Sequence, residues 1–176
     1  LGGMTVGLGQ RRLSIIDLSP AGHQPMLNPA CGDAMVFNGE IYNYQDLRRP
    51  MDARGQQFRG HSDTEVMLYG VREDGPAYFE KTFGMFAVAY FDASRRRLLL
   101  TRDPMGIKPL YVAEAQGCLL FASEVRAILA SGLVPARFDT QGLATTLAYG
   151  CVQEPLSVFE GIRAFEPGVW EWIDLD

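Results

Sequence analysis

Gly84-Met85-Phe86-Ala87-Val88-Ala89-Tyr90-Phe91 is an apolar run in which no polar residue alternates with the apolar ones. A strand of this kind is buried on both faces, as in layered sheets that are covered by helices. Around it the sequence predicts more strands and a few helices, without regular alternation of strand and helix. This order favours an α+β fold over a doubly wound parallel sheet.

Short-range signals predict the other elements. Ser62-Asp63-Thr64-Glu65 has the capping-box pattern and predicts a helix from about Asp63 to Glu73. The other predicted strands are Thr5–Gly9, Leu13–Asp17, Ala34–Phe37, Leu98–Arg102, Leu110–Ala115, Cys118–Ala122 and Val169–Ile173, the last at a sheet edge. Two further helices are predicted to follow caps at Ser123-Glu124 and Asp139-Thr140, and to end at Ala130 and Tyr149.

The composition excludes several classes of protein. A length of 176 residues suits one domain with a substantial core. The net charge of −5 gives no reason to expect a nucleic-acid partner. Three irregularly spaced cysteines and two histidines argue against a disulfide framework or a metal site, and indicate a reducing, cytoplasmic setting. No apolar run approaches the roughly 20 residues of a membrane span, so no membrane partner is expected.

One arginine and two acidic residues could bind the charged ends of a small zwitterion. Arg12 follows a polar pair at the mouth of a predicted strand, where a guanidinium could grip both oxygens of a carboxylate. Asp63 opens the predicted helix, where the macrodipole favours an ionised carboxylate that could receive an ammonium group. Glu40 could add its side chain or its carbonyl. Taken alone, an arginine such as Arg12 is better explained by a surface salt bridge, and Asp63 is at least as well explained by simple capping of its helix.

Asn38 and Gly39 offer two donors to a developing oxyanion. The side-chain amide of Asn38 and the unobstructed backbone N–H of Gly39 could stabilise the tetrahedral intermediate of an attacked carbonyl. Asn-Gly is also the commonest two-residue hairpin signal, although a strand-like partner follows only weakly here. Both interpretations of the pair remain open from the residues alone.

Together these residues lie in blocks that resemble the glutaminase domain of glutamine-hydrolysing asparagine synthetases. The blocks cover almost the whole chain in order. They are Arg11–Ser19, Gly22–Met26, Phe37–Asn43, Ser62–Val66, Gly84–Ala87, Arg102–Tyr111, Phe121–Glu124 and Phe159–Arg163. The chain is thereby identified as similar to the class II glutamine amidotransferases, within the N-terminal nucleophile hydrolases.

The resemblance implies a fold and a set of roles. The fold would be a four-layer α-β-β-α sandwich of two mainly antiparallel sheets, with residues 1–176 forming a single glutaminase domain. Arg12 would hold the carboxylate of L-glutamine, and the backbone of Leu13, Ser14, Ile15 and Ile16 would line the pocket. Asn38 and Gly39 would form the oxyanion hole, and Glu40 and Asp63 would receive the ammonium group. Arg102, Asp103, Gly106 and Lys108 match a family signature that we interpret as structural.

The sequence departs from the family at its start. The family's nucleophile is a cysteine that opens the mature chain and uses its own α-amino group as the base. Leu1 is not that residue, and Cys31, Cys118 and Cys151 do not match its place. We therefore expect that the nucleophile segment is absent and that these residues alone have no glutaminase activity. Gln10 also stands where the family often has histidine.

The resemblance also implies partners. The chain's own C-terminal synthetase domain, absent here, would use ATP and Mg²⁺ to amidate a carboxylate, with aspartate as the default acceptor, whereas the glutaminase domain would need no cofactor. Relatives are often dimers, which leaves a homodimer open. One alternative is a catalytically inactive scaffold of the kind found in β-lactam synthetases. A second is an unrelated α+β module that binds amino acids.

Overall fold

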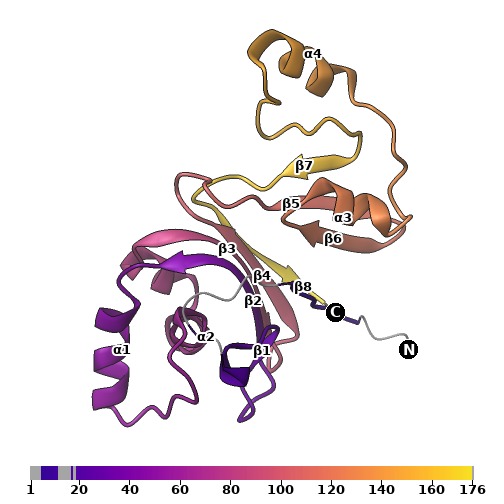
Figure 1. Cartoon of the computed structure of the whole chain (residues 1–176). Coiled ribbons are helices and arrows are strands. Elements are labelled where there is room, and N and C mark those ends of the chain that lie inside the picture. Colours follow the sequence, from indigo (N-terminus) through magenta and orange to yellow (C-terminus); the bar gives the residue numbers. More distant parts are fainter. Residues whose placement is uncertain (1–4, 12–16, 18, 176) are drawn as a thin grey trace. The chain divides into compact units, whose positions relative to one another are not determined.

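The chain forms two compact units. The computed structural model describes residues 5–11, 17 and 19–175. One unit comprises Leu1–Thr101 with Trp170–Asp176, and the other comprises Arg102–Val169 (Figure 1). That residues 1–176 act as a single functional domain stays a prediction.

A five-stranded sheet organises the first unit, with the strand order β1-β2-β3-β4-β8. Strand β2 pairs antiparallel with both β1 and β3, and β8 pairs antiparallel with β4 at the edge. The last strand pair places Thr101 opposite Trp170, so the chain leaves and re-enters this sheet at neighbouring positions. The strands are β1 (Met26–Leu27), β2 (Ala34–Ile41), β3 (Gly84–Asp92), β4 (Arg97–Arg102) and β8 (Trp170–Asp174).

Helix α2 (Asp63–Asp74) begins where the capping pattern predicts. The Ser62 hydroxyl accepts a 3.2 Å hydrogen bond from the Glu65 backbone N–H, and Gly75 ends the helix at a φ of 61°. Every residue from Asp63 to Val71 is buried, because the helix contacts β1, β2, helix α1 (Tyr44–Ala53) and the 3₁₀ helix η2 (Gly75–Lys81). The predicted helix is confirmed, and its start is fixed deep inside the unit.

Helix α1 (Tyr44–Ala53) is an element that the sequence did not predict. Its residues are mostly polar and include Pro50, so its sequence has weak helical signals. It forms because Tyr44, Leu47 and Met51, spaced at helical intervals, pack against the core of the first unit. That core lies between α2 and the sheet and includes Met26, Met35, Phe37, Ile41, Val66, Met67, Leu68, Phe86, Val88 and Leu99.

A three-stranded antiparallel sheet organises the second unit, with the order β6-β5-β7. Helix α3 packs on β5 and β6, around buried Ile128 and Ile162. Asp139 caps α4 by accepting a 2.7 Å hydrogen bond from the Gly142 N–H. The elements are β5 (Tyr111–Ala115), β6 (Cys118–Ala122), α3 (Val125–Ala130), α4 (Thr140–Tyr149) and β7 (Ile162–Ala164).

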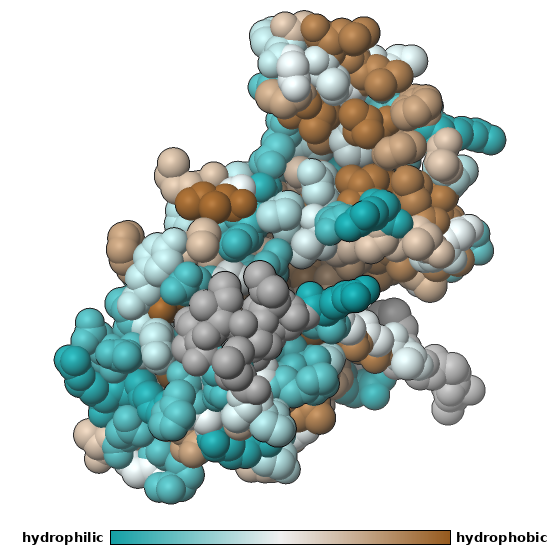
Figure 2. Space-filling view, viewed as in Figure 1, coloured by the Kyte–Doolittle hydropathy of each residue, from teal (hydrophilic) through white to brown (hydrophobic). Residues whose placement is uncertain are grey.

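Hydrophobic side chains gather on the surface of the second unit around α4 (Figure 2). Leu147 on this helix is 88% exposed, and Phe138 just before it is 60% exposed. Only Gly142 is buried along α4, where an added Cβ would lie 2.0 Å from the Ser157 carbonyl oxygen. Helix α4 thus packs closely against its unit at Gly142, whereas its large apolar residues Leu147 and Tyr149 are exposed.

The guanidinium of Arg102 is a buried hub of the second unit. It donates to both carboxylate oxygens of Glu154 at 2.9 Å and to the carbonyl oxygens of Gly106, Lys108 and Phe165. These five bonds match the five N–H donors of an arginine. Asp103 beside it accepts from the backbone N–H groups of Met105, Ile107 and Lys108. Their contacts support the structural interpretation of this signature.

Most predicted elements are confirmed, with two corrections. Thr5–Gly9 is not a strand, since Gly7 and Gly9 leave it without side chains that could pack on a sheet. The strand predicted to end at Phe37 continues to Ile41, so Asn38-Gly39 is not a hairpin turn. The sequence signals did not predict β1, β7 or the 3₁₀ helices η1 (Pro20–Gly22) and η2 (Gly75–Lys81). The strand predicted over Leu13–Asp17 lies almost entirely outside the described residues.

The α+β class with mainly antiparallel sheets is confirmed by both units. Among the described residues, no helix is both long and apolar enough to cross a bilayer. Cys31, Cys118 and Cys151 are all free thiols.

Candidate active site

The predicted oxyanion pair lies inside strand β2. Asn38 pairs with Ala87 and Gly39 pairs with Phe86 of β3, and both residues are half-buried. The strand is held at Phe37, whose backbone N–H donates to the side-chain oxygen of Gln24 at 2.6 Å. It is held again at Ile41, whose N–H donates to Asp63 at 3.0 Å. Asn38 and Gly39 lie between these two fixed points.

The Gly39 N–H points to the same edge of β2 as the hydrogen bonds donated by Phe37 and Ile41. Backbone N–H groups of residues two apart point to the same edge of a strand. Because Phe37 and Ile41 both donate to side chains rather than to β3, the N–H of Gly39 also faces away from β3. An exposed strand edge with an N–H and a neighbouring amide side chain is the arrangement that an oxyanion hole needs.

Gly39 is required by the close approach of two backbones. A Cβ built on Gly39 would lie 2.1 Å from the Met85 carbonyl oxygen and 2.7 Å from the Phe86 Cα. Gly84 stands in a matching position, where a Cβ would lie 2.2 Å from the Glu40 carbonyl oxygen. Strands β2 and β3 therefore lie so close together here that neither position has room for a Cβ, which only glycine lacks.

Asp63 reaches this strand from the first turn of α2. Its Oδ2 accepts the 3.0 Å bond from Ile41, and its Oδ1 accepts a 2.8 Å bond from the Thr64 N–H. The side chain is 5% exposed. Burial raises the pKa of the Asp63 carboxyl, the two backbone hydrogen bonds oppose that rise, and the nearby charge of Glu40 adds to it.

Asp63 and Glu40 together form a site that favours a cation. Neither carboxylate forms an ion pair with a lysine, arginine or histidine among the residues that the structure describes. A buried carboxylate beside a second negative charge is costly without a cation, so an ammonium group would relieve both. The structure thus brings Asn38, Gly39, Glu40 and Asp63 together where the start of α2 meets the end of β2, and their roles toward glutamine stay a prediction.

The other predicted binding residues, Arg12, Leu13, Ser14, Ile15 and Ile16, lie outside the described residues. Gln10, just before them, is described. Its side-chain nitrogen donates to the Phe37 carbonyl at 2.8 Å, and its oxygen accepts from the Phe37 N–H at 3.2 Å. The side-chain amide of Gln10 thus pairs with the backbone of Phe37 in β2, next to Asn38.

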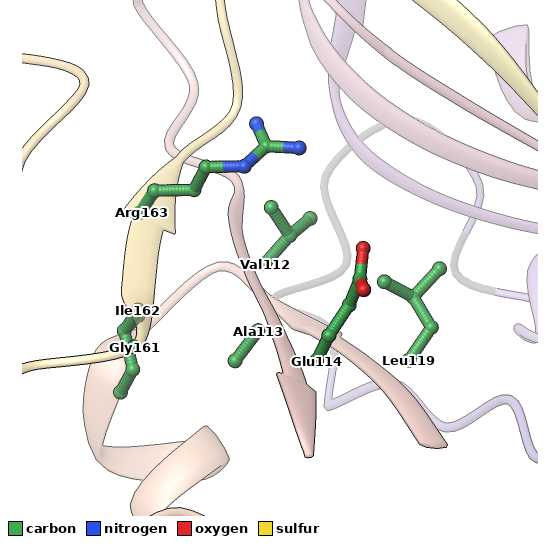
Figure 3. Close-up of a pocket in the computed structure, with 7 residues that line it drawn as sticks. All are labelled: Val112, Ala113, Glu114, Leu119, Gly161, Ile162 and Arg163. Carbon is green, nitrogen blue, oxygen red and sulfur yellow. The ribbon is translucent and has the colours of Figure 1, made fainter. Parts of the chain in front are cut away.

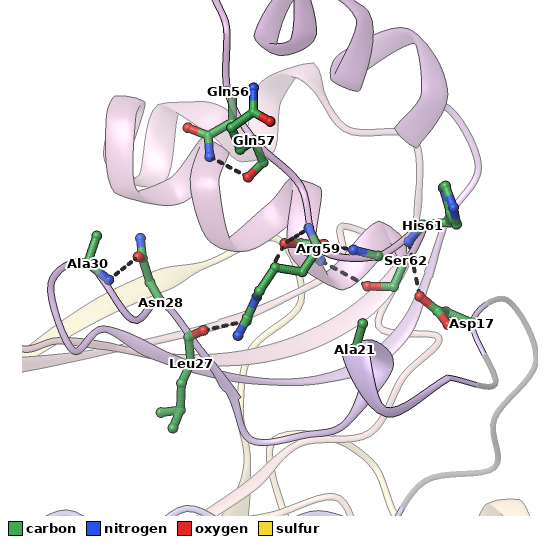
Figure 4. Close-up of polar contacts among 12 residues, drawn as sticks. Asp17, Ala21, Leu27, Asn28, Ala30, Gln56, Gln57, Arg59, His61 and Ser62 are labelled. Carbon is green, nitrogen blue, oxygen red and sulfur yellow. Dashed lines mark hydrogen bonds and ion pairs between the residues drawn. The ribbon is translucent and has the colours of Figure 1, made fainter.

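Sequence reasoning missed two residues that support the site. Gln24 is 5% exposed, and its amide lies between Phe37 and the Thr64 hydroxyl, 3.4 Å away. Asp17 is 7% exposed and accepts from the backbone N–H of His61, two residues before Asp63. Figure 4 shows Asp17 and His61 joined in this way. Each is a polar residue next to a recognised motif. That position could have indicated a supporting role from the sequence alone.

A separate pocket of about 330 Å³ lies in the second unit (Figure 3). Its lining comes from β5, β6, β7 and the glycine just before β7, and consists of Val112, Ala113, Glu114, Leu119, Gly161, Ile162 and Arg163. It contains none of the residues predicted to bind glutamine. The described residues also hold no cluster of histidine, cysteine and acidic side chains that could bind a metal ion.

Comparison with known proteins identifies the family of this chain. The glutamine amidotransferase domain family matches residues 3–176. The chain is 38% identical to asparagine synthetase [glutamine-hydrolyzing] 3 of Bacillus subtilis over 162 residues, which are 90% of this chain and 26% of that protein. It is also 38% identical to a putative asparagine synthetase of Mycobacterium bovis over 183 residues, covering 97% of this chain and 27% of that protein. The chain thus spans about a quarter of the length of these relatives.

Two solved structures share the fold. An allosteric regulatory enzyme of purine biosynthesis matches with a TM-score of 0.65 and 19% identity, over 93% of this chain and 32% of its own. The glutamine phosphoribosylpyrophosphate amidotransferase of B. subtilis matches with a TM-score of 0.55 and 23% identity, over 62% of this chain and 26% of its own. The predicted fold, of the N-terminal nucleophile hydrolase type, is confirmed. The chain belongs to the glutamine amidotransferase domain family and is homologous to the glutaminase domains of asparagine synthetases.

Proposed function

We propose that this domain binds L-glutamine and hydrolyses it to glutamate and ammonia. The observation that carries the proposal is the Asp63 carboxylate, which is buried, close to Glu40 and without a cation among the described residues. It lies beside the strand edge that bears Asn38 and Gly39. A ligand that places an ammonium group at Asp63 and an amide carbonyl at Asn38 and Gly39 has the chemistry of glutamine.

In the proposed reaction a cysteine thiolate attacks the side-chain amide carbon of glutamine. Asn38 and Gly39 donate to the resulting oxyanion. Collapse of the intermediate breaks the C–N bond as the nitrogen takes up the proton that the thiol gave up, and ammonia leaves. Water then cleaves the γ-glutamyl thioester, which gives glutamate and restores the thiol. Arg12 would hold the substrate carboxylate, with the backbone of Leu13, Ser14, Ile15 and Ile16 around it.

The attacking thiol requires a low pKa, and Cys31 does not have one. Burial raises the pKa of the Cys31 thiol, which makes it a poor nucleophile at neutral pH. Cys118 and Cys151 are exposed residues of the second unit. We expect a cysteine outside these residues to supply the thiol.

The ammonia would pass to a synthetase domain in a longer protein. Glutamine-hydrolysing asparagine synthetases are the relatives that support this assignment, and aspartate is the default acceptor. That domain would use ATP and Mg²⁺, whereas the glutaminase domain itself needs no cofactor. We place the protein in the cytoplasm, in line with its three free thiols, and a homodimer remains part of the proposal. The family match favours this function over that of an inactive scaffold.

Glutamine binding tests the proposal without requiring turnover. Isothermal titration calorimetry on the full chain compares L-glutamine with 4-carbamoylbutanoate, which lacks only the ammonium group. Wild type should bind L-glutamine more tightly, and Asp63→Asn should abolish that preference while leaving the affinity for 4-carbamoylbutanoate unchanged. Asp139→Asn, which alters a helix cap in the second unit, is the matched control. Equal affinities of wild type for both ligands would refute the proposal.

A further inference from the structure

Two buried carboxylates hold the segment that leads into α2. Glu65 accepts the backbone N–H groups of Arg59 and Gly60, each at 2.9 Å. Asp17 accepts the N–H of His61 at 3.0 Å. Three successive N–H groups, Arg59 to His61, therefore end on two carboxylates. This differs from a standard capping box, in which the glutamate would bind the N–H of the cap residue itself.

Gly60 leaves room for these carboxylates. A Cβ on Gly60 would lie 2.5 Å from Oδ2 of Asp17 and 3.0 Å from the Cβ of Ala21. It would also lie 3.6 Å from Oε2 of Glu65. Gly60 is therefore enclosed by both acids, and any larger residue would push Asp17 away from His61.

Asp17 is itself fixed in place. Its Oδ1 accepts a 2.9 Å bond from the Ser19 N–H, so each carboxylate oxygen has a backbone donor. Hydrogen bonds from Ser19 and His61 lower the pKa of the Asp17 carboxyl to about 2. The carboxylate is thus ionised at neutral pH, and its hydrogen bonds are charge-assisted and correspondingly strong.

The segment held by Asp17 sets the position of Asp63. His61 is followed by Ser62, whose hydroxyl caps the helix, and then by Asp63. Asp63 must reach the Ile41 N–H at 3.0 Å from this helix start, a geometry that a small displacement of the start would break.

We propose that Asp17 is a positioning residue, which holds the start of α2 through His61 and so keeps the Asp63 carboxylate in place for the substrate's ammonium group. This inference rests on the proposed function, because the ammonium group belongs to the glutamine of that proposal. Asp17 touches no substrate and acts only through Asp63. A residue that merely stabilised the fold would leave the ammonium preference intact.

Calorimetry on Asp17→Asn tests this role. The asparagine keeps the shape but can accept only one of the two backbone bonds well. We expect the affinity for L-glutamine to fall about tenfold, in line with the loss of one charged hydrogen bond. The affinity for 4-carbamoylbutanoate should stay unchanged. Asp17→Asn with Asp63→Asn should bind no more weakly than Asp63→Asn alone, because one residue acts through the other.

Asp92→Asn is the matched control. Asp92 is another buried aspartate of the first unit that accepts from a backbone N–H, that of Arg95 at 3.0 Å, in the turn after β3. Its replacement should lower the melting temperature and leave both affinities unchanged. Gly60→Ala offers a second variant with no charge change, and it should reproduce the selective loss of glutamine affinity if Asp17→Asn does not fold. Equal weakening of both ligands, or additive effects with Asp63→Asn, would overturn the inference.

An NMR titration of the Asp63 carboxyl gives a readout that needs no ligand. Its pKa should be raised in wild type and return toward the ordinary value of 3.8 in Asp17→Asn or Gly60→Ala, because a displaced Asp63 loses its buried position. An unchanged Asp63 titration would overturn the inference even in a chain that binds no glutamine. Failure of wild type to prefer glutamine would instead count against the proposed function alone.

Discussion

The backbone N–H of Ile41 donates a 3.0 Å hydrogen bond to the carboxylate of Asp63, and this bond joins the end of β2 to the start of α2. In the proposed function, the strand carries the oxyanion donors and the helix carries the carboxylate for the ammonium group. One bond therefore sets the spacing between the two ends of the proposed substrate. This spacing matters because reacting groups must be held to within a fraction of an ångström.

Glutamine binding should weaken as the pH falls, with a midpoint above that of an ordinary aspartate. The pKa of Asp63 is raised above 3.8, so its ionised form is lost at a higher pH, and the ammonium group binds that form. Binding should therefore release protons in this range. Calorimetry in buffers of different ionisation enthalpy measures that release, and Asp63→Asn should remove it. Proton release that persists in Asp63→Asn would assign the effect to another group.

Gly39→Ala should destabilise the chain by about 1–3 kcal/mol, the usual cost of overpacking. The new Cβ would lie 2.1 Å from the Met85 carbonyl oxygen, so β2 must move away from β3. Glutamine affinity should fall with it, because Asn38 moves with the strand. Urea unfolding measures the stability. The control is Gly9→Ala, where no atom lies within 4 Å of the added Cβ, and similar destabilisation of both variants would contradict this account.

Arg102→Lys should destabilise the second unit by about 3–5 kcal/mol, since a lysine cannot replace a buried guanidinium that binds Glu154 through two bonds. Hydrogen exchange should accelerate for the amides of β5 and β7. Arg163→Lys, at an exposed arginine of the same unit, is the control and should change little. Unaltered exchange in Arg102→Lys would exclude the structural role that we assign to this signature.

Acid should destabilise the first unit between about pH 4 and pH 2. The pKa of Asp17 is lowered from 3.8 to about 2, and those of Asp33 and Asp92 are also lowered. A lowered pKa stabilises the fold above the unfolded value, and that stability disappears as the pH falls through the folded value. The Asp17 carboxylate should therefore contribute part of this loss. Unfolding measured against pH should show wild type and Asp17→Asn converging near pH 2, and a constant gap would disprove the assignment.

Local signals predicted the elements whose formation depends on near neighbours. The Ser62 cap and the Asp139 cap begin helices where expected. The run Gly84–Phe91 forms β3 together with Asp92, and its central residues 86–90 are buried. Helix α1 could not be predicted in this way, because its polar sequence is held by the core beneath it. The extension of β2 through Asn38 also depends on distant residues, since β3 and Asp63 bind that segment.

The candidate site was predicted in part for the same reason. Glu40 and Asp63 could be chosen from their chemical types and from a family resemblance. The hydrogen bond from the His61 N–H to Asp17 joins residues 44 positions apart, and no local pattern predicts that contact. Gln10 and Gln24 likewise act on Phe37 over 27 and 13 positions.

The pairing of Thr101 with Trp170 has a consequence for how such a protein could be altered. The chain departs for the second unit from one strand and returns on its immediate neighbour, so the whole excursion from Arg102 to Val169 begins and ends at adjacent points. A short turn could bridge those points. The remaining five strands would then form an uninterrupted sheet, and the excised portion could be exchanged between homologues as a cassette.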